Sequence, residues 1–150
     1  MKIGLASDHG GYNLKLEILN YLNEKGIECI DFGPNNSLES VDYPIFGEKV
    51  ANAVVSKEVD YGIVCCGTGI GISLAANKVP GIRCAVVSDV FSAKMSKAHN
   101  DANMLSLGER VLGRGLALEI VEAWINTEFE GDRHSKRVDM IKEIEARHSK

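Results

Sequence analysis

Short apolar runs alternate with helical segments along the whole chain, and this alternation constrains the fold more than any other feature. The expected strands lie at residues 2–6, 27–32, 62–65, 82–87 and 103–107. The expected helices lie near residues 14–25, 43–55, 70–78, 90–98, 116–125 and 135–147. Strands joined by helices form a parallel sheet that helices cover on both faces. The sequence therefore predicts an α/β fold, a Rossmann-like three-layer α/β/α sandwich with a five-stranded parallel sheet.

The length and charge of the chain limit its domain count and its partners. Its 150 residues suit a single domain, and no linker or repeat divides them. A formal net charge of −4 argues against nucleic acid or an anionic membrane as the main partner, because both favour a basic face. No apolar stretch approaches membrane-spanning length, and the first residues lack a signal-peptide pattern. We therefore expect a cytoplasmic protein.

The four cysteines are expected to be free thiols. Cys29 and Cys84 lie in apolar runs, where cysteine acts as a small core residue. Cys65 and Cys66 are adjacent, which suits neither a zinc knuckle nor an unstrained disulfide. Because side chains alternate along a strand, one of this pair should face the core and the other the loop that follows. We expect no metal site and no cofactor.

The stretch Cys65-Cys66-Gly67-Thr68-Gly69-Ile70-Gly71 gives the strongest functional signal. It joins an apolar strand to a helix and has glycine at every second position from Gly67. Glycines let backbone N–H groups approach a ligand, and a helix N-terminus adds partial positive charge. A thiol at such a place ionises more readily and can act as a base or a nucleophile. Ile72 stands where a dinucleotide fingerprint needs glycine, so we interpret the loop as an anion cradle beside a thiol.

Other polar residues have a structural interpretation as well as a functional one. Asp8 and His9 follow the first strand, at the same sheet edge as Cys66. Asp8 also suits a helix cap, and the two roles are compatible. His99 ends a helix, where histidine commonly stabilises the C-terminus. The basic run at 133–137 would commonly be a solvated helix start, but its charge opposes the helix dipole unless an anion neutralises it, which favours a phosphate site.

Motifs along nearly the whole chain resemble those of the type B ribose-5-phosphate isomerases, a family that includes allose-6-phosphate and galactose-6-phosphate isomerases. The matching motifs are Ser7-Asp8-His9-Gly10-Gly11, Asp42-Tyr43-Pro44, Cys66-Gly67-Thr68-Gly69-Ile70-Gly71, Ala75-Ala76-Asn77-Lys78, His99-Asn100-Asp101-Ala102-Asn103 and Arg133-His134 with Arg137. The resemblance implies an enzyme of the pentose phosphate pathway. It would interconvert ribose 5-phosphate and ribulose 5-phosphate through a cis-enediolate, without a cofactor.

The resemblance also implies a role for each matching residue. Cys66 would be the base, and backbone N–H groups from Gly67 to Gly71 would stabilise the enediolate. His99 would open the sugar ring, with Asp8 and Thr68 assisting. The implied substrate-binding residues are Asp8, His9, Tyr43, Gly67, Thr68, Gly69, Ile70, Gly71, Asn100, Arg110, Arg133 and Arg137, of which His9 and the arginines would hold the phosphate.

Chain topology divides these residues between two edges of the sheet. A helix that returns between parallel strands runs antiparallel to them, so His99 and Asn100 should lie at the edge opposite Cys66. The residues from 133 to 137 should lie there too, whereas Arg110 should lie beside Cys66. We therefore predict a homodimer, possibly a tetramer, whose active sites are shared between subunits and whose C-terminal helix packs on the partner.

Three other functions stay open on the sequence alone. An isomerase of allose or galactose 6-phosphate would share these motifs, because its substrate has one more hydroxymethylene group. A non-catalytic sugar-phosphate or nucleotide sensor would need the cradle and the arginines but not the thiol. A phosphatase with a thiol nucleophile would need an arginine inside the loop, which has none.

Overall fold

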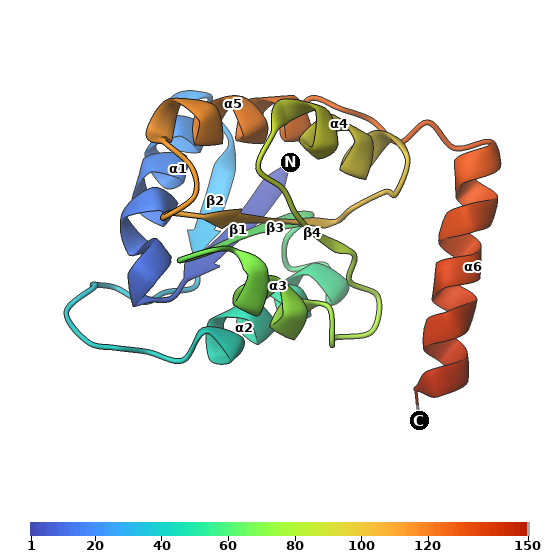
Figure 1. Cartoon of the computed structure of the whole chain (residues 1–150), viewed down its shortest axis with the longest axis horizontal. Coiled ribbons are helices and arrows are strands. Elements are labelled where there is room, and N and C mark those ends of the chain that lie inside the picture. The colour runs from blue at the N-terminus through green and yellow to red at the C-terminus, as the bar shows by residue number, and fades with distance from the viewer. Residues whose placement is uncertain (150) are drawn as a thin grey trace.

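Each of the five apolar runs forms a strand of one parallel sheet in the computed structural model, which describes residues 1–149 (Figure 1). The strands are β1 (Lys2–Ser7), β2 (Glu28–Asp31), β3 (Tyr61–Cys66), β4 (Cys84–Val86) and β5 (Met104–Gly108), in the order β2-β1-β3-β5-β4. The helices are the 3-10 helix η1 (His9–Gly11), α1 (Tyr12–Glu24), α2 (Tyr43–Val55), α3 (Ile70–Ala76), α4 (Val90–Ala98), α5 (Arg114–Ile125) and α6 (Arg133–His148).

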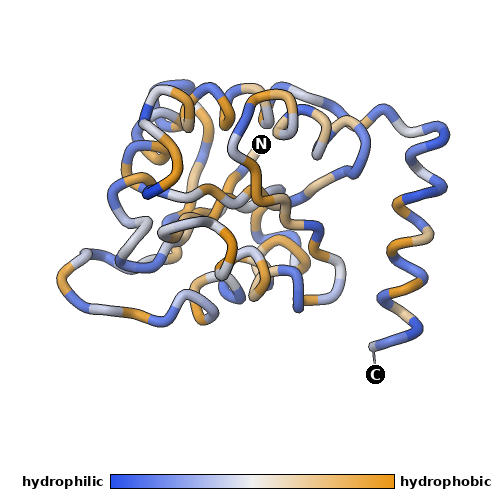
Figure 2. Tube along the Cα trace, viewed as in Figure 1, coloured by the Kyte–Doolittle hydropathy of each residue, from blue (hydrophilic) through white to orange (hydrophobic). Residues whose placement is uncertain are grey.

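Helices cover both faces of the sheet, so the predicted three-layer sandwich is confirmed. Figure 1 shows α1, α4 and α5 on one face and α2 and α3 on the other. Alternate residues of β3 face the two layers: Ile63 and Cys65 pack with the first group of helices. Val64 and Cys66 pack with the second group. Figure 2 shows hydrophobic segments concentrated along the strands at the centre of the molecule.

Some element boundaries differ from the predicted ones by two residues. β4 begins at Cys84 instead of Ile82, because the N–H of Arg83 donates to the side chain of Asn103 rather than to a strand. α5 begins at Arg114, and α3 ends at Ala76. α6 begins at Arg133 rather than at position 135, and this shift places the basic run inside the first helical turns.

The strand order brings the carboxyl ends of β1 and β3 side by side. These strands pair with Ser7 opposite Cys65. The chain leaves β1 for β2 on one side and then crosses to β3 on the other, so the strand order reverses between β1 and β3. Ligands of open parallel sheets bind outside the carboxyl ends of the strands at such a reversal. Asp8 and Cys66 therefore flank the position that this fold favours for a ligand.

Helix α6 stands apart from the three layers (Figure 1). Glu145 ties it to the body, because both of its carboxylate oxygens accept the N–H of Gly81 at 3.1 Å. The side chains of Met140, Ile141 and Ile144 are about half exposed on this helix. A cavity of about 620 Å³ separates α6 from the segment around β4. None of the helices in residues 1–149 is long and apolar enough to cross a membrane.

A buried lysine lies between two aromatic rings on the α4–α5 face. Lys97 is 3% exposed, and its Nζ lies 4.0 Å from the ring centroid of Tyr61 and 4.4 Å from that of Trp124. The rings attract the cation, but burial removes its hydration and lowers the pKa of Lys97 to about 8, an effect that Asp101 partly opposes. The unfolded chain keeps its lysine protonated up to about pH 10.4.

Replacing Lys97 with methionine should therefore remove a pH-dependent contribution to stability. Between about pH 8 and pH 10.4 the unfolded state binds the proton and the folded state does not, so this group stabilises the fold increasingly as the pH rises. The free energy of unfolding of the wild type, relative to Lys97→Met, should rise by on the order of 1–2 kcal/mol from pH 7 to pH 10. Urea denaturation at both values measures this, with the exposed Lys94→Met as the control that shows no such change.

Candidate active site

The loop between β3 and α3 is fixed by close contacts with β5. Gly69 has a φ of 80°, in the left-handed region that favours glycine. A Cβ atom at Gly69 would lie 2.9 Å from the carbonyl carbon of Leu107. The hydroxyl of Ser106 donates to the carbonyl oxygen of Gly69 at 2.6 Å. A side chain at position 69 would therefore push the loop away from β5.

The thiol of Cys66 lies at the start of this loop and accepts a backbone hydrogen bond. The N–H of Gly69 donates to Cys66 Sγ at 3.1 Å. The N–H groups of Gly67 and Thr68 have no acceptor among residues 1–149. Helix α3 has only seven residues, so these N–H groups, more than a helix dipole, would attract an anion.

The alternation along β3 places the two adjacent thiols in opposite layers, and both are buried, with Cys65 0% and Cys66 5% exposed. Cys65 is fully buried in the layer beneath α1 and α5, and burial raises the pKa of its thiol well above the usual range. Cys66 faces the opposite layer, where the loop begins. All four cysteines are free thiols, as expected. Of the pair, Cys66 is the one whose sulfur accepts an N–H of the loop.

The segment after β1 packs directly on this loop. A Cβ atom at Gly11 would lie 2.4 Å from the carbonyl carbon of Cys65, so only glycine allows the contact. Asp8 Oδ1 accepts the N–H of Gly11 at 3.0 Å, which confirms the predicted capping role. His9 is exposed, and its Nδ1 accepts the N–H of Val41 at 3.1 Å. Asp8 and His9 are thereby held beside the thiol loop.

Tyr43 and Arg110 lie against the same loop. A Cβ atom at Gly71 would lie 2.8 Å from the Tyr43 ring, and one at Gly67 would lie 3.5 Å from Arg110 Cδ. The N–H of Arg110 also donates to the carbonyl oxygen of Gly67 at 3.0 Å. We call this group the thiol half-site, and it consists of Asp8, His9, Tyr43, Cys66, Gly67, Thr68, Gly69, Ile70, Gly71 and Arg110.

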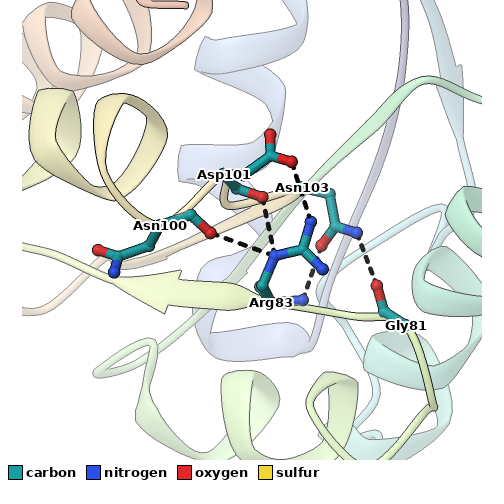
Figure 3. A network of polar contacts seen from close by, with 5 residues as sticks. All are labelled: Gly81, Arg83, Asn100, Asp101 and Asn103. Atoms are coloured by element: carbon teal, nitrogen blue, oxygen red, sulfur yellow. Dashed lines mark hydrogen bonds and ion pairs between the residues drawn. The ribbon is translucent and has the colours of Figure 1, made fainter. Parts of the chain in front are cut away.

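Asn100 lies in the loop that joins α4 to β5, and Arg83 fixes that loop (Figure 3). Arg83 Nε donates to the backbone carbonyl oxygens of Asn100 and Asp101 at 3.2 and 3.0 Å. Asn103 accepts the N–H of Arg83 at 2.7 Å, and its own amide donates to the Gly81 carbonyl oxygen at 2.8 Å. Figure 3 shows the carboxamide of Asn100 pointing away from Arg83.

His99 packs on the start of α6. The rings of His99 and His134 stack with centroids 4.0 Å apart and planes 10° apart. Glu130 Oε1 lies 3.8 Å from His99 Nε2 and 3.6 Å from His134 Nε2. The N–H of Glu130 donates to the carbonyl oxygen of Ala98 at 2.9 Å, which ties this turn to the end of α4. We call this group the histidine half-site, and it consists of His99, Asn100, Glu130, Arg133, His134 and Arg137.

The two half-sites lie at opposite edges of the sheet within one chain. Gly62 pairs with Met104, and Cys66 pairs with Gly108 four residues later, a length of about 13 Å along the strands. His99 precedes β5, whereas Cys66 ends β3. The structure therefore places Arg110 with Cys66 and places His99 with the start of α6, and one chain does not bring the two groups together.

Within residues 1–149, His99, Glu130 and His134 are the one group whose donor atoms lie close enough to suggest a metal site, all within 4.8 Å. The lone pair of an imidazole nitrogen lies in the plane of its ring. Because the two rings are stacked and nearly parallel, a single ion cannot lie in both planes. The group is therefore better suited to ring stacking than to metal binding.

His134 and Glu130 are the residues that sequence reasoning missed. A solvated helix start, the common alternative to a phosphate site for the run at 133–137, does not hold for His134, which is 5% exposed. Its burial follows from the earlier start of α6, which turns the ring toward His99. The i, i+4 spacing of Glu130 and His134 indicates that their side chains could meet. The sequence does not show that the turn docks on α4, which is what brings them to His99.

Comparisons with known proteins identify the family of this chain. The sequence pattern of the Ribose/Galactose Isomerase family matches residues 3–141. Ribose-5-phosphate isomerase B of Escherichia coli (strain K12) is 51% identical over 146 residues, which cover 97% of this chain and 97% of that protein.

Solved structures show the same likeness. Ribose-5-phosphate isomerase B of Clostridium thermocellum has a TM-score of 0.98 at 62% identity, covering 99% of this chain and 100% of that chain. The Mycoplasma genitalium enzyme, solved with bound ribulose-5-phosphate, has a TM-score of 0.92 at 38% identity, covering 97% and 96%. The chain therefore belongs to the ribose/galactose isomerase family, and its resemblance to the type B ribose-5-phosphate isomerases is confirmed.

Proposed function

We propose that this protein interconverts ribose 5-phosphate and ribulose 5-phosphate, as a cytoplasmic enzyme of the pentose phosphate pathway. Family membership supports sugar phosphate isomerisation, and the relatives named above are ribose-5-phosphate isomerases. In this chain, the observation that supports the chemistry is the Gly69 N–H bond to Cys66 Sγ, beside the N–H groups of Gly67 and Thr68. Allose or galactose 6-phosphate is the alternative substrate, which has one more hydroxymethylene group.

Cys66 is the base of the isomerisation in this proposal. Its thiolate takes the proton from C2 of the open-chain aldose and returns it to C1, while a proton moves from the C2 oxygen to the C1 oxygen. Negative charge develops on the C1 oxygen in the cis-enediolate, and the N–H groups of the loop from Gly67 to Gly71 stabilise it. Removing one such donor typically raises a barrier by about 2.7–4 kcal/mol.

Ring opening needs an acid and a base on the two oxygens of the anomeric carbon. His99 gives a proton to the ring oxygen as the bond from that oxygen to C1 breaks. The anomeric hydroxyl releases its proton to Asp8, with Thr68 assisting, and the aldehyde remains. Asn100 binds a sugar hydroxyl, and Tyr43 lines the face of the sugar. His9, Arg110, Arg133 and Arg137 hold the phosphate, because guanidinium groups bind phosphate oxygens in pairs.

These roles require residues of both half-sites, so we propose a homodimer, possibly a tetramer, with active sites shared between subunits. A two-fold axis brings the thiol half-site of one chain to the histidine half-site of the other. Helix α6 supports this arrangement, because it stands away from its own chain and presents Met140, Ile141 and Ile144 about half exposed. In the dimer, α6 would pack on the partner subunit.

Replacing Cys66 with alanine should lower kcat for ribose 5-phosphate by about 10²–10⁴-fold, the usual contribution of a general base. Binding of ribose 5-phosphate, measured by calorimetry, should persist, because the N–H groups and arginines remain. Cys65→Ala is the matched control and should keep kcat within about threefold of wild type, since that thiol is buried away from the loop. Undiminished turnover in Cys66→Ala would favour a base other than this thiol, and absence of turnover in the wild type would favour the sensor.

Mixed dimers test the shared site directly. Co-expression of Cys66→Ala and His99→Asn chains with different tags, followed by isolation of the mixed dimer, should give about half of the wild-type activity, because one of its two sites is intact. The matched control is a dimer of one wild-type chain and one chain with both substitutions, which should be inactive. Activity in the control and none in the first dimer would show that each site lies within a single chain.

A further inference from the structure

The surroundings of His99 distinguish it from the histidine stacked on it. The side chain of His99 is 36% exposed, whereas that of His134 is 7% exposed. His134 Nε2 is buried and has no hydrogen-bond partner within residues 1–149. Both Nε2 atoms lie near one carboxylate oxygen of Glu130, at 3.8 and 3.6 Å. Two imidazoles thus share one carboxylate, and only one of them has access to a substrate.

We propose that Glu130 and His134 are positioning residues for ring opening, in which Glu130 stabilises the protonated His99 ring and His134 fixes the plane of that ring. This inference rests on the proposed role of His99 as the acid. Neither residue touches the sugar in this scheme, and both act through the orientation and charge of His99.

The charges around the pair disfavour a proton on His134. The groups that face His134 are His99, Glu130, Arg133 and Arg137. Burial lowers the pKa of His134, and the neighbouring His99 and Arg133 lower it further, while Glu130 opposes them. His134 therefore stays neutral near pH 7, and the negative charge of Glu130 is available to an imidazolium at His99.

The stack has a geometric consequence for proton transfer. A ring held flat on its neighbour at 4.0 Å loses the freedom to turn about its own side-chain bonds. The backbone around it is fixed as well, because the N–H of His99 donates to the Met95 carbonyl oxygen at 2.8 Å and Glu130 is tied to Ala98. The His99 ring is thus oriented before the substrate binds, and it moves little when its proton is transferred to the sugar.

Two substrates separate ring opening from proton transfer between carbons. Ribose 5-phosphate closes into a furanose and needs an acid to open. D-Erythrose 4-phosphate cannot form this ring, because phosphate occupies the oxygen that would close it, and it needs only the base. The measured quantity is the ratio of kcat on ribose 5-phosphate to kcat on erythrose 4-phosphate. A general fault in folding or in the thiol half-site lowers both values and leaves this ratio unchanged.

Glu130→Gln and His134→Ala should each lower this ratio about tenfold, and His134→Phe, which keeps a flat ring, should lower it less than His134→Ala. Glu128→Gln, an exposed carboxylate two residues away, is the matched control and should leave the ratio at the wild-type value. In Glu130→Gln the alkaline limb of kcat for ribose 5-phosphate should also move to lower pH, because the imidazolium loses its counter-charge. This second readout does not depend on erythrose 4-phosphate being a good substrate.

A different result separates the two proposals. If His99→Asn lowers the ratio but Glu130→Gln and His134→Ala leave the ratio and the pH profile unchanged, the positioning role is wrong and His99 acts alone. If His99→Asn also leaves the ratio unchanged, ring opening at His99 is wrong, and the inference about its neighbours is overturned with it. The isomerase activity would stand in both cases, because it is tested independently at Cys66.

Discussion

The parallel register of the sheet is the constraint on which the rest of this structure depends. Because β3 and β5 run in the same direction, every loop that follows a strand lies at one edge and every loop that precedes a strand lies at the other. Cys66 follows β3 and His99 precedes β5, so no change of rotamer can bring them together in one chain. A reaction that needs both residues therefore requires a second subunit, and the half-exposed apolar side chains of α6, which stands apart from the three layers, agree with that requirement.

The thiol half-site depends on close approach between backbones rather than on side-chain contacts. Gly11 and Gly69 lie where a Cβ atom would meet the backbone of Cys65 or Leu107 within 3 Å. These contacts hold η1 and the end of β5 closely against the loop. Packing alone therefore requires glycine at position 69, and in the proposed function the same loop also binds the substrate.

Most of the fold and the residues of the thiol half-site could be predicted from the sequence, because their signals are local. The cap at Asp89, the proline after Tyr43 and the glycine after α1 mark helix ends that the structure shows. His134 could not be predicted in the same way. Its burial depends on a turn with positive φ at Gly131 and Asp132, and on the docking of that turn against Ala98. Such contacts between distant segments leave no periodic pattern in the chain.

The same physical device occurs in both half-sites. Cys65 is adjacent to Cys66, and His134 is stacked on His99, so each reacting group of the proposed mechanism has a like neighbour that the mechanism does not use. Burial inactivates one member of each pair: it raises the pKa of Cys65 and lowers that of His134, which keeps both neutral. The Gly69 N–H donates to Cys66, and the carboxylate of Glu130 lies near both imidazoles, of which only His99 is appreciably exposed. In the proposed mechanism the packed layers keep Cys65 and His134 neutral, and contacts within single loops determine how Cys66 and His99 react.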